Sequence, residues 1–564
     1  MEIPAPTPKS PPPADDLDSQ TPPPPAPPPA PVPPFPPPPL PPPSPTFPPT
    51  SLPPAPPTVP PTIPSAPVPS VVEGPLPSGG FARPSLPPLP TAPPPPQPPV
   101  ILPPVGGGPG LSALEQARNI VRPLAILGFL AFLIIVGISF FGSNLACLPY
   151  VGQFLGTCQR DVSLTYWGIW EDAAVVNPLL ADFVATYEAQ NPNVELTINY
   201  EKRAFSTLDQ YKDTLKTRLA EGTGPDVVRV HNSWVSGLTG ELAPLPANVL
   251  SEADYTSRFY PAALASAKSG EELFAIPLEY DGIVLFYNKG MFEGIDVASE
   301  LSTWEGFRRQ AVRLTTWEDN DPGKKILQSG AAFGTANNVS HSPDLFSLLL
   351  AQSGVDPLTQ LATPAAADAL TFYANFSKTD RVWDETLPFS VNAFANGQVA
   401  MIFGPSWRAL EIKSLNPQLD FVAVPVPQLA GVVEGGIHWG SFWMEGVSRD
   451  SREPEIAWRL LEFLTQEEQQ RAFFSAASVF RAFGEPYSLR SLAPSLADDP
   501  LLAPLLAGAP GAKTGKTVDF SGNDPYAAAF KQAISDVLAG KSATEALETA
   551  QATINQLEGK SPSQ

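Results

Sequence analysis

Residues that could carry out catalysis occur in few recognisable arrangements in this sequence. The stretch GAKTGKT (511–517) resembles a phosphate-binding loop, but the first glycine of that motif would have to stand at Pro510. The three histidines are far apart and the two cysteines lie elsewhere, so no zinc-binding spacing appears. No serine-nucleophile motif appears either. The sequence therefore predicts no catalytic residue, no metal ligand and no cofactor.

The tryptophans are better candidates for a functional site, and all ten follow Asp161. Trp304 and Trp458 fall within helical patterns, which favours packing. Other tryptophans fall at apparent strand ends or in loops, where side chains can border a cleft. An aromatic ring covers the apolar C–H face of a solute, while carboxylates and amides bind its hydroxyl groups. The cleft candidates of this kind are Trp167, Trp170, Trp234, Trp407, Trp439 and Trp443.

Hydrophobic periodicity predicts the elements that must position these residues. Strand and helix patterns alternate from Asp161 onward, which is typical of an α/β sheet with crossover helices. About 400 residues exceed one hydrophobic core, so two lobes are expected. Ser302 with Glu305, and Ser542 with Glu545, fit the capping box that begins a helix. The first predicted elements are strand 161–167, helix 175–190, strand 194–201, helix 206–222 and strand 225–231.

Several stretches, taken together in order, resemble one known family. They are LTYWGIW, NPNVELTINY, GPDVVRV, GELAPLP, IPLEYDGIVLFYNKGMFEG, STWEGFRRQAVRLT, FANGQVAMIFGPSW, AWRLLEFLTQEEQQRAFF and GKSATEALETAQATINQL. In this order and spacing they resemble the family 1 extracellular solute-binding proteins, the maltose-binding-protein-like receptors of ATP-binding cassette importers. The resemblance spans residue 161 to about residue 558.

The resemblance implies a periplasmic-binding-protein-like fold, in which two α/β lobes are joined by a hinge and ligand binds between them. The hinge-like crossing corresponds to PLEYDG (277–282), which contains Tyr280 and Asp281. Asp281 falls where the maltose-binding branch has a carboxylate that binds hydroxyl groups, and Trp407 is the aromatic residue after the GP pair. The loops that often carry ligand contacts in this family contain Trp170, Trp234 and Trp439. With Trp167 and Tyr280, these residues are the predicted ligand contacts.

The N-terminal part of the chain has a different composition. Residues 1–110 contain 50 of the 76 prolines, which excludes helix and sheet and predicts a disordered or polyproline II tail. Such a tail is either a spacer or a strip that docks a cytoplasmic partner through PxxP segments. A short juxtamembrane segment (111–122) leads to PLAILGFLAFLIIVGISFFG (123–142), which is apolar on every face and long enough to be a transmembrane helix.

The charges around this span predict its orientation. Arg118 and Arg122 precede it, and no Lys or Arg follows until Arg160, so we expect a cytoplasmic N-terminus and an extracytoplasmic C-terminal domain. A linker (143–160) contains the only cysteines, Cys147 and Cys158, an even pair that predicts a disulfide. The alternative is cleavage and lipidation at Cys147, which would leave the other cysteine free.

Residues 161–564 form the predicted solute-binding domain, and they contain 50 acidic and 29 basic residues. This negative charge argues against nucleic acid as a partner, because phosphate binding requires a basic surface. We therefore expect a membrane-anchored receptor that binds a small solute, a sugar or oligosaccharide first, and passes it to a membrane-embedded permease. A cell-surface glycoside hydrolase, and a sensor that signals through the membrane helix to the tail, are the alternatives.

Overall fold

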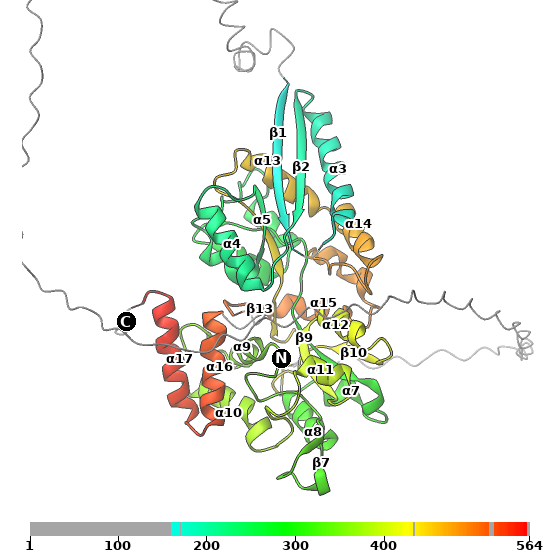
Figure 1. Ribbon diagram of the computed structural model, residues 1–564, viewed down its shortest axis with the longest axis vertical. Helices are drawn as coiled ribbons and strands as arrows, with labels where there is room; N and C mark the ends of the chain where they lie inside the picture. The colour runs from blue at the N-terminus through cyan, green and yellow to red at the C-terminus, as the bar shows by residue number, and fades with distance from the viewer. Residues whose placement is uncertain (1–158, 170, 433–434, 518–523, 561–564) are drawn as a thin grey trace, which may run out of the picture. The chain divides into compact units, whose positions relative to one another are not determined.

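A computed structural model describes residues 159–169, 171–432, 435–517 and 524–560 of the chain (Figure 1). The predicted proline-rich tail, juxtamembrane segment and transmembrane helix lie outside these residues, as do Cys147 and Cys158. Among the residues that the structure describes, no helix has the length and apolar character needed to cross a bilayer. The division into tail, span and linker therefore stays a prediction.

The first lobe is built on a four-stranded sheet in the order β12-β3-β1-β2. β1 is parallel to both β2 and β3, and β12 is antiparallel to β3. Val162 and Leu164 are buried while Ser163 between them is exposed, as the alternation predicted. Every residue of β3 is buried, because the strand lies between two others. The strands are β1 (Arg160–Gly168), β2 (Val194–Lys202), β3 (Val227–His231) and β12 (Trp443–Val447).

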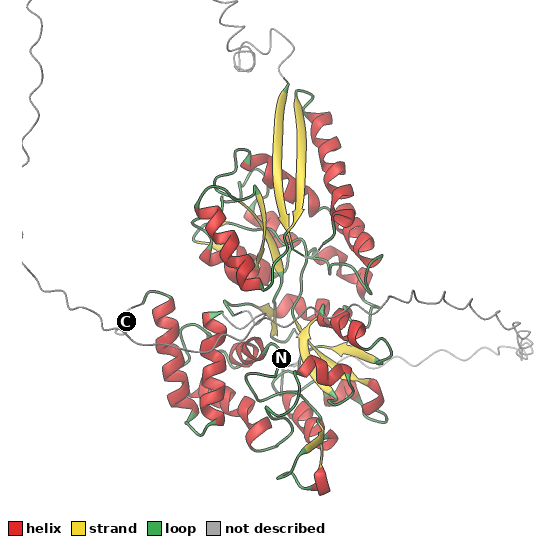
Figure 2. Ribbon diagram, in the orientation of Figure 1, coloured by secondary structure: helices red, strands yellow, loops and turns green. Residues whose placement is uncertain are grey.

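Helices flank the strands of the first lobe (Figure 2). α3 contains the predicted helix 175–190 and begins two residues earlier, where the Asp172 side chain accepts a hydrogen bond from the Ala174 amide. The helices of this lobe come from two separate parts of the chain. They are α3 (Ala173–Gln190), α4 (Leu208–Ala220), α5 (Glu252–Arg258), α6 (Pro261–Ala267), α13 (Pro454–Leu464) and α14 (Glu467–Ser478).

The second lobe contains a three-stranded sheet in the order β10-β6-β9, and both pairs are antiparallel. The strands are β6 (Ile283–Asn288), β9 (Met401–Pro405) and β10 (Phe421–Val424). Short pairs join β7 (Thr316–Trp317) to β8 (Ile326–Gln328), and β11 (His438–Trp439) to β13 (Ala512–Lys513). A further short pair, β4 (Lys268–Ser269) with β5 (Glu272–Leu273), precedes the hinge and belongs to the first lobe. The helices of this lobe are α7 (Val297–Glu300), α8 (Trp304–Leu314), α9 (Ser342–Gln352), α10 (Pro364–Lys378), α11 (Ser390–Ala395), α12 (Arg408–Leu415), α15 (Ala503–Gly508), α16 (Pro525–Leu538) and α17 (Ala543–Leu557).

Two of the predicted helix starts can be compared with the structure. Ser542 caps α17 by accepting a hydrogen bond from the Glu545 amide, as predicted. The cap predicted at Ser302 is wrong by one residue. Thr303 is the extended residue that accepts from the Gly306 amide, whereas the Ser302 hydroxyl donates to the Ser299 carbonyl. Trp304 and Trp458 are buried in their helices, so their assignment to packing is confirmed.

The chain passes between the lobes more than once, and the connecting segments lie side by side. Residues 277–282, the predicted hinge, lead into β6. They run next to residues 440–442, since the Ser441 amide donates to the Asp281 carbonyl and Gly282 forms a bridge with Gly440. A Cβ atom on Gly282 would lie 2.5 Å from the Trp439 carbonyl oxygen, so this close approach requires glycine.

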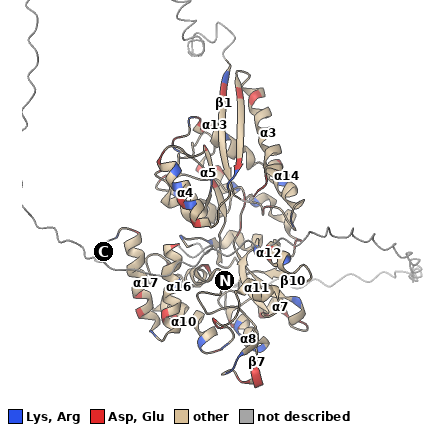
Figure 3. Cartoon of the chain, viewed as in Figure 1, with Lys and Arg blue, Asp and Glu red and all other residues tan. Residues whose placement is uncertain are grey.

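Charged residues of both signs occur on both lobes (Figure 3). Most are exposed, and their ion pairs contribute little to stability because solvent screens them. One group of buried charged residues lies where the connecting segments meet the first sheet, beside the site described next.

Candidate functional site

A cavity of about 260 Å³ lies beside the predicted hinge, where segments of both lobes meet. The hinge contributes two carboxylates, the turn into α12 contributes a tryptophan, and the segment after α14 contributes an arginine and a phenylalanine. The lining thus combines aromatic and apolar side chains with ionisable groups, as ligand sites commonly do. The lining residues are Glu279, Asp281, Ser406, Trp407, Leu410, Glu411, Trp443, Arg481, Phe483, Glu485 and Pro486.

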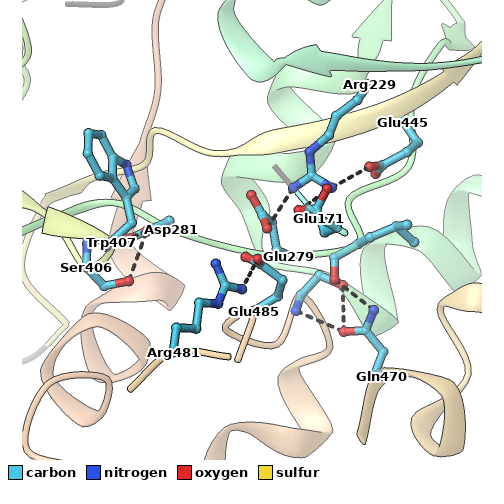
Figure 4. A network of polar contacts seen from close by, with 12 residues as sticks. Glu171, Arg229, Glu279, Asp281, Ser406, Trp407, Glu445, Gln470, Arg481 and Glu485 are labelled. Carbon is cyan, nitrogen blue, oxygen red and sulfur yellow. Dashed lines mark hydrogen bonds and ion pairs between the residues drawn. The ribbon is translucent and has the colours of Figure 1, made fainter. Parts of the chain in front are cut away.

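Asp281 holds the turn that carries Trp407 (Figure 4). Its Oδ1 accepts hydrogen bonds from the amides of Gly282 (2.7 Å) and Ser406 (2.8 Å). Its Oδ2 accepts from the Ser406 hydroxyl (2.9 Å) and the Trp407 amide (3.3 Å). The Ser406 and Trp407 amides precede α12 and have no helical acceptor, so the carboxylate satisfies them and connects the hinge to the second lobe. Asp281 thus lines the cavity, but its oxygens already accept hydrogen bonds from the protein, and its role in ligand binding stays a prediction.

Burial raises the pKa of Asp281 to about 7, because the charged form loses hydration. The hydrogen bonds from Ser406, Gly282 and Trp407 act in the opposite direction and stabilise the carboxylate. A protonated Asp281 can still accept the two amide hydrogen bonds on Oδ1 while donating from Oδ2 to the Ser406 hydroxyl. The turn therefore keeps its main contacts in either protonation state.

Arg229 is the centre of a second polar network, next to the cavity in the first lobe. Its guanidinium is 2.7 Å from a carboxylate oxygen of Glu279, 3.0 Å from Glu445 and 3.4 Å from Glu171. Glu445 also accepts a hydrogen bond from the Tyr166 hydroxyl. All five side chains are buried. The guanidinium thus connects β3, β12 and the hinge through buried ion pairs.

Glu279 and Glu485 form the part of this network that lines the cavity. Their carboxyl groups hydrogen-bond to each other, which requires a proton on one of them, and Arg481 forms an ion pair with Glu485. Burial raises the pKa of Glu279 well above its ordinary value. Burial acts in the same direction on Glu485, but the hydrogen bond with Glu279 and the charge of Arg481 outweigh it and lower the pKa of Glu485. Glu279 is therefore the weaker acid of the pair.

Carboxylate oxygens of Glu171, Glu279 and Glu485 lie within 4.8 Å of one another, a spacing that would also suit a cation. Arg229 already contacts the first two of these residues, and Arg481 contacts the third. We therefore interpret the cluster as an ion-pair network around two guanidinium groups.

The other predicted ligand contacts pack around the cavity instead of lining it. Trp439 is 2% exposed, and its ring N–H donates to Asp344. Tyr280 packs between Tyr260 and Phe442. Their assignment as ligand contacts stays a prediction.

Trp234 and Trp167 are also enclosed by neighbouring side chains. Trp234 packs edge-on against Trp443, and Trp167 lies under the Arg203 guanidinium at 4.1 Å. Trp170 lies outside the described residues. For Trp234 and Trp167, as for the residues above, the structure assigns a packing neighbour. The role of all three tryptophans in ligand binding stays a prediction.

Sequence reasoning missed the segment 481–486, which contributes four lining residues. The signal was present in VFRAFGEPY, where aromatic residues and an arginine precede a Gly–Glu–Pro turn. Only the fold brings this segment to the hinge, through the bridge between Glu279 and Tyr487.

We predict that Asp281→Ala lowers the free energy of unfolding by roughly 2–4 kcal/mol, because it leaves buried amides without an acceptor. Asp281→Asn should cost much less, since its oxygen accepts both amide hydrogen bonds and its NH₂ donates to Ser406. Urea unfolding of the two variants at pH 6 measures the difference. Equal stability of the alanine and asparagine variants would contradict this assignment.

The buried carboxyl groups also predict how stability depends on pH. Burial raises the pKa of Glu445 to about 7, so the folded state holds its proton more tightly than the unfolded state, whose pKa is about 4.3. This contribution to stability is fully present below about pH 4 and is lost as the pH rises towards 7. A glutamine at this position is neutral at every pH. In the Glu445→Gln variant the free energy of unfolding should therefore fall by roughly 2–3 kcal/mol less than in the wild type over this pH interval.

Urea unfolding between pH 4.5 and 8 measures that decline. Glu455→Gln, at an exposed position on α13, is the matched control and should leave it unchanged. A wild-type protein whose stability rises over this interval would refute the assignment.

Comparisons with known proteins agree with this geometry. A family described as bacterial extracellular solute-binding protein matches residues 182–503, more than half of the chain. A binding protein from Brucella abortus (strain 2308) is 20% identical over 312 residues, which cover 54% of this chain and 72% of the relative. A galactooligosaccharide-binding protein from Bacillus subtilis (strain 168) is 21% identical over 315 residues, which cover 54% of this chain and 69% of that relative.

Among solved structures, a cyclic α-maltosyl-1,6-maltose binding protein from Arthrobacter globiformis superposes with a TM-score of 0.56. It is 19% identical, and the alignment covers 70% of this chain and 99% of that one. The likeness confirms the predicted two-lobed α/β fold, and the family confirms a binding protein in place of the hydrolase alternative. The chain is a member of the bacterial extracellular solute-binding protein family.

Proposed function

We propose that the chain captures a carbohydrate outside the cell and delivers it to the permease of an ATP-binding cassette importer. The observation that carries this proposal is the composition of the cavity. Trp407 and Phe483 offer aromatic surface from two different lobes, while Glu279 and Glu485 offer carboxyl groups. Sugar rings present apolar C–H faces and hydroxyl groups, and this lining matches both.

Similar proteins support the same solute class. The relative from Bacillus subtilis is named for galactooligosaccharides, and the structure from Arthrobacter globiformis for a cyclic maltose-based sugar. Binding between two lobes also provides a signal for a permease, because a hinge movement that encloses the solute changes the shape of the receptor. The importer is thus the partner that the family and the cavity favour.

We further propose that residues 123–142 anchor the receptor and that the solute-binding domain lies outside the membrane. The apolar span and the arginines before it support this orientation. The proline-rich tail would then lie in the cytoplasm, available to a partner that recognises PxxP segments.

A panel of sugars tests the solute class. We expect maltose-type or galactose-based oligosaccharides to raise the melting temperature of the full-length protein in detergent, because binding to the folded state stabilises it by mass action. Trp407→Ala should weaken binding by about 1–3 kcal/mol, since the ring provides a large apolar contact. Isothermal titration measures the loss.

Trp317→Ala is the control variant for this titration. Trp317 follows α8, and its ring N–H donates to the Arg381 carbonyl, away from the cavity lining. Its variant should bind as the wild type does. Equal affinity of the Trp407→Ala variant and the wild type would show that the cavity is not the sugar site.

Protease treatment of intact cells tests the orientation. The domain after the span should be digested by added protease, with loss of a C-terminal tag, since the charge bias places it outside. A cytoplasmic marker protein should stay intact in the same sample. Protection of the domain until the cells are lysed would rule out a receptor for external solutes.

A further inference from the structure

Trp407 has a cation stacked on its ring. The guanidinium carbon of Arg408 lies 4.2 Å from the ring centroid, a distance typical of a cation–π contact. Trp407 is partly exposed and lines the cavity. The stacked guanidinium therefore restricts the orientation of a ring that borders the proposed binding space.

The Arg408 guanidinium is held from two directions. Its Nε–H donates to Nε2 of His341 at 3.0 Å, and Nη1 forms an ion pair with Glu411, one turn further along α12. A planar guanidinium makes these contacts and stacks on the ring at the same time, because its donors lie in one plane. A lysine ammonium would keep the charge but has no such plane.

The contact with Arg408 determines which ring nitrogen of His341 carries the proton. Arginine only donates, so Nε2 of the imidazole accepts and the ring proton lies on Nδ1. Nδ1 faces a carboxylate oxygen of Asp344 at 3.3 Å. The other oxygen of Asp344 accepts from the ring N–H of Trp439 at 3.1 Å. The hydrogen-bonded chain thus runs from Trp439 through Asp344 and His341 to Arg408.

The chain is rigid because it is buried and based on the start of α9. His341, Asp344 and Trp439 are at most 2% exposed. His341 adopts a left-handed backbone conformation, with φ of 62°, immediately before the helix. Non-glycine residues adopt this conformation rarely, and usually where surrounding contacts enforce it.

We infer that Arg408 is a positioning residue for solute binding, which holds the Trp407 ring in place and is itself oriented by the chain His341–Asp344–Trp439. This inference rests on the proposed function, because it assumes that the solute contacts Trp407. On this inference Trp439, which is buried, would act on binding only through the chain and without touching the solute. A ring fixed before binding loses less conformational freedom when the solute arrives.

The first test needs no solute. Acrylamide quenching of tryptophan fluorescence is measured on the full-length protein. For the wild type and for each variant, a matched protein that also carries Trp407→Phe is measured, and the difference between the two signals is the contribution of Trp407. Arg408→Lys should increase the quenching of this component, because the ring becomes more mobile and more accessible. Arg459→Lys, an arginine paired with Glu455 on α13, should leave it unchanged. Unchanged quenching in Arg408→Lys would overturn the inference.

The second test is a double-mutant cycle with maltotetraose as the probe. Arg408→Lys should weaken binding about threefold to tenfold, measured at a temperature at which variant and wild type are both fully folded. Combined with Trp407→Ala, it should add no further loss, because Arg408 acts through that ring. Fully additive losses would overturn the inference.

Substitution of His341 separates positioning from packing. His341→Gln retains an acceptor for Arg408 and a donor for Asp344, so its affinity and quenching should stay near those of the wild type. His341→Leu should resemble Arg408→Lys. Equal quenching in the glutamine and leucine variants would overturn the role of the chain. If maltotetraose does not bind, the proposal that the receptor takes maltose-type oligosaccharides fails. The quenching measurements, which need no solute, still decide whether Arg408 positions the Trp407 ring.

Discussion

The burial of charge beside the cavity is the constraint on which the rest of this structure depends. Arg229 lies in the central region of the first sheet with three carboxylates around it. A buried guanidinium is costly unless charged partners surround it, and a buried carboxylate has the same requirement. The strands β3 and β12 and the hinge must therefore keep their relative positions, or ionised groups would be left without partners in a poorly solvated interior.

The hinge segment uses two carboxylates, two residues apart, to contact the two lobes. Glu279 contacts Arg229 in the first lobe, and Asp281 accepts hydrogen bonds from the turn before α12 in the second lobe. Tyr280, between them, packs against aromatic rings. Each end of this short connection is thus tied to its own lobe.

The same arrangement determines the character of the cavity. The polar groups on its wall mainly contact other protein groups, since Glu279 contacts Arg229, Glu485 contacts Arg481 and Asp281 contacts its turn. Polar groups that already have protein partners cost little free energy when a neutral solute covers them. A carboxylate without a partner would instead favour a cation. Trp407 and Phe483 then provide the apolar surface that a sugar ring needs.

The sequence by itself determined those helices and strands that depend only on neighbouring residues along the chain. The alternation in β1, the helical spacing in α3 and the cap of α17 follow from side-chain periodicity and capping chemistry, which need no distant residue. The family resemblance added the order of the lobes and the identity of the hinge. It also predicted that Asp281 and Trp407 lie at one site; Asp281 precedes β6, Trp407 follows the neighbouring strand β9, and both line the cavity.

Only the tertiary structure decided which side chains are free to line the cavity. Trp234, Tyr280 and Trp439 have the residue types and loop positions of ligand contacts, but packing against other aromatic rings or a carboxylate buries them. Phe483 and Glu485 lie in VFRAFGEPY, whose aromatic residues and turn do not by themselves indicate which surface they face. The bridge from Glu279 to Tyr487 brings their segment to the hinge. The physical reason is that burial and ion pairing depend on residues hundreds of positions apart, such as Arg229 and Glu445, which sequence patterns over one helix or strand do not relate.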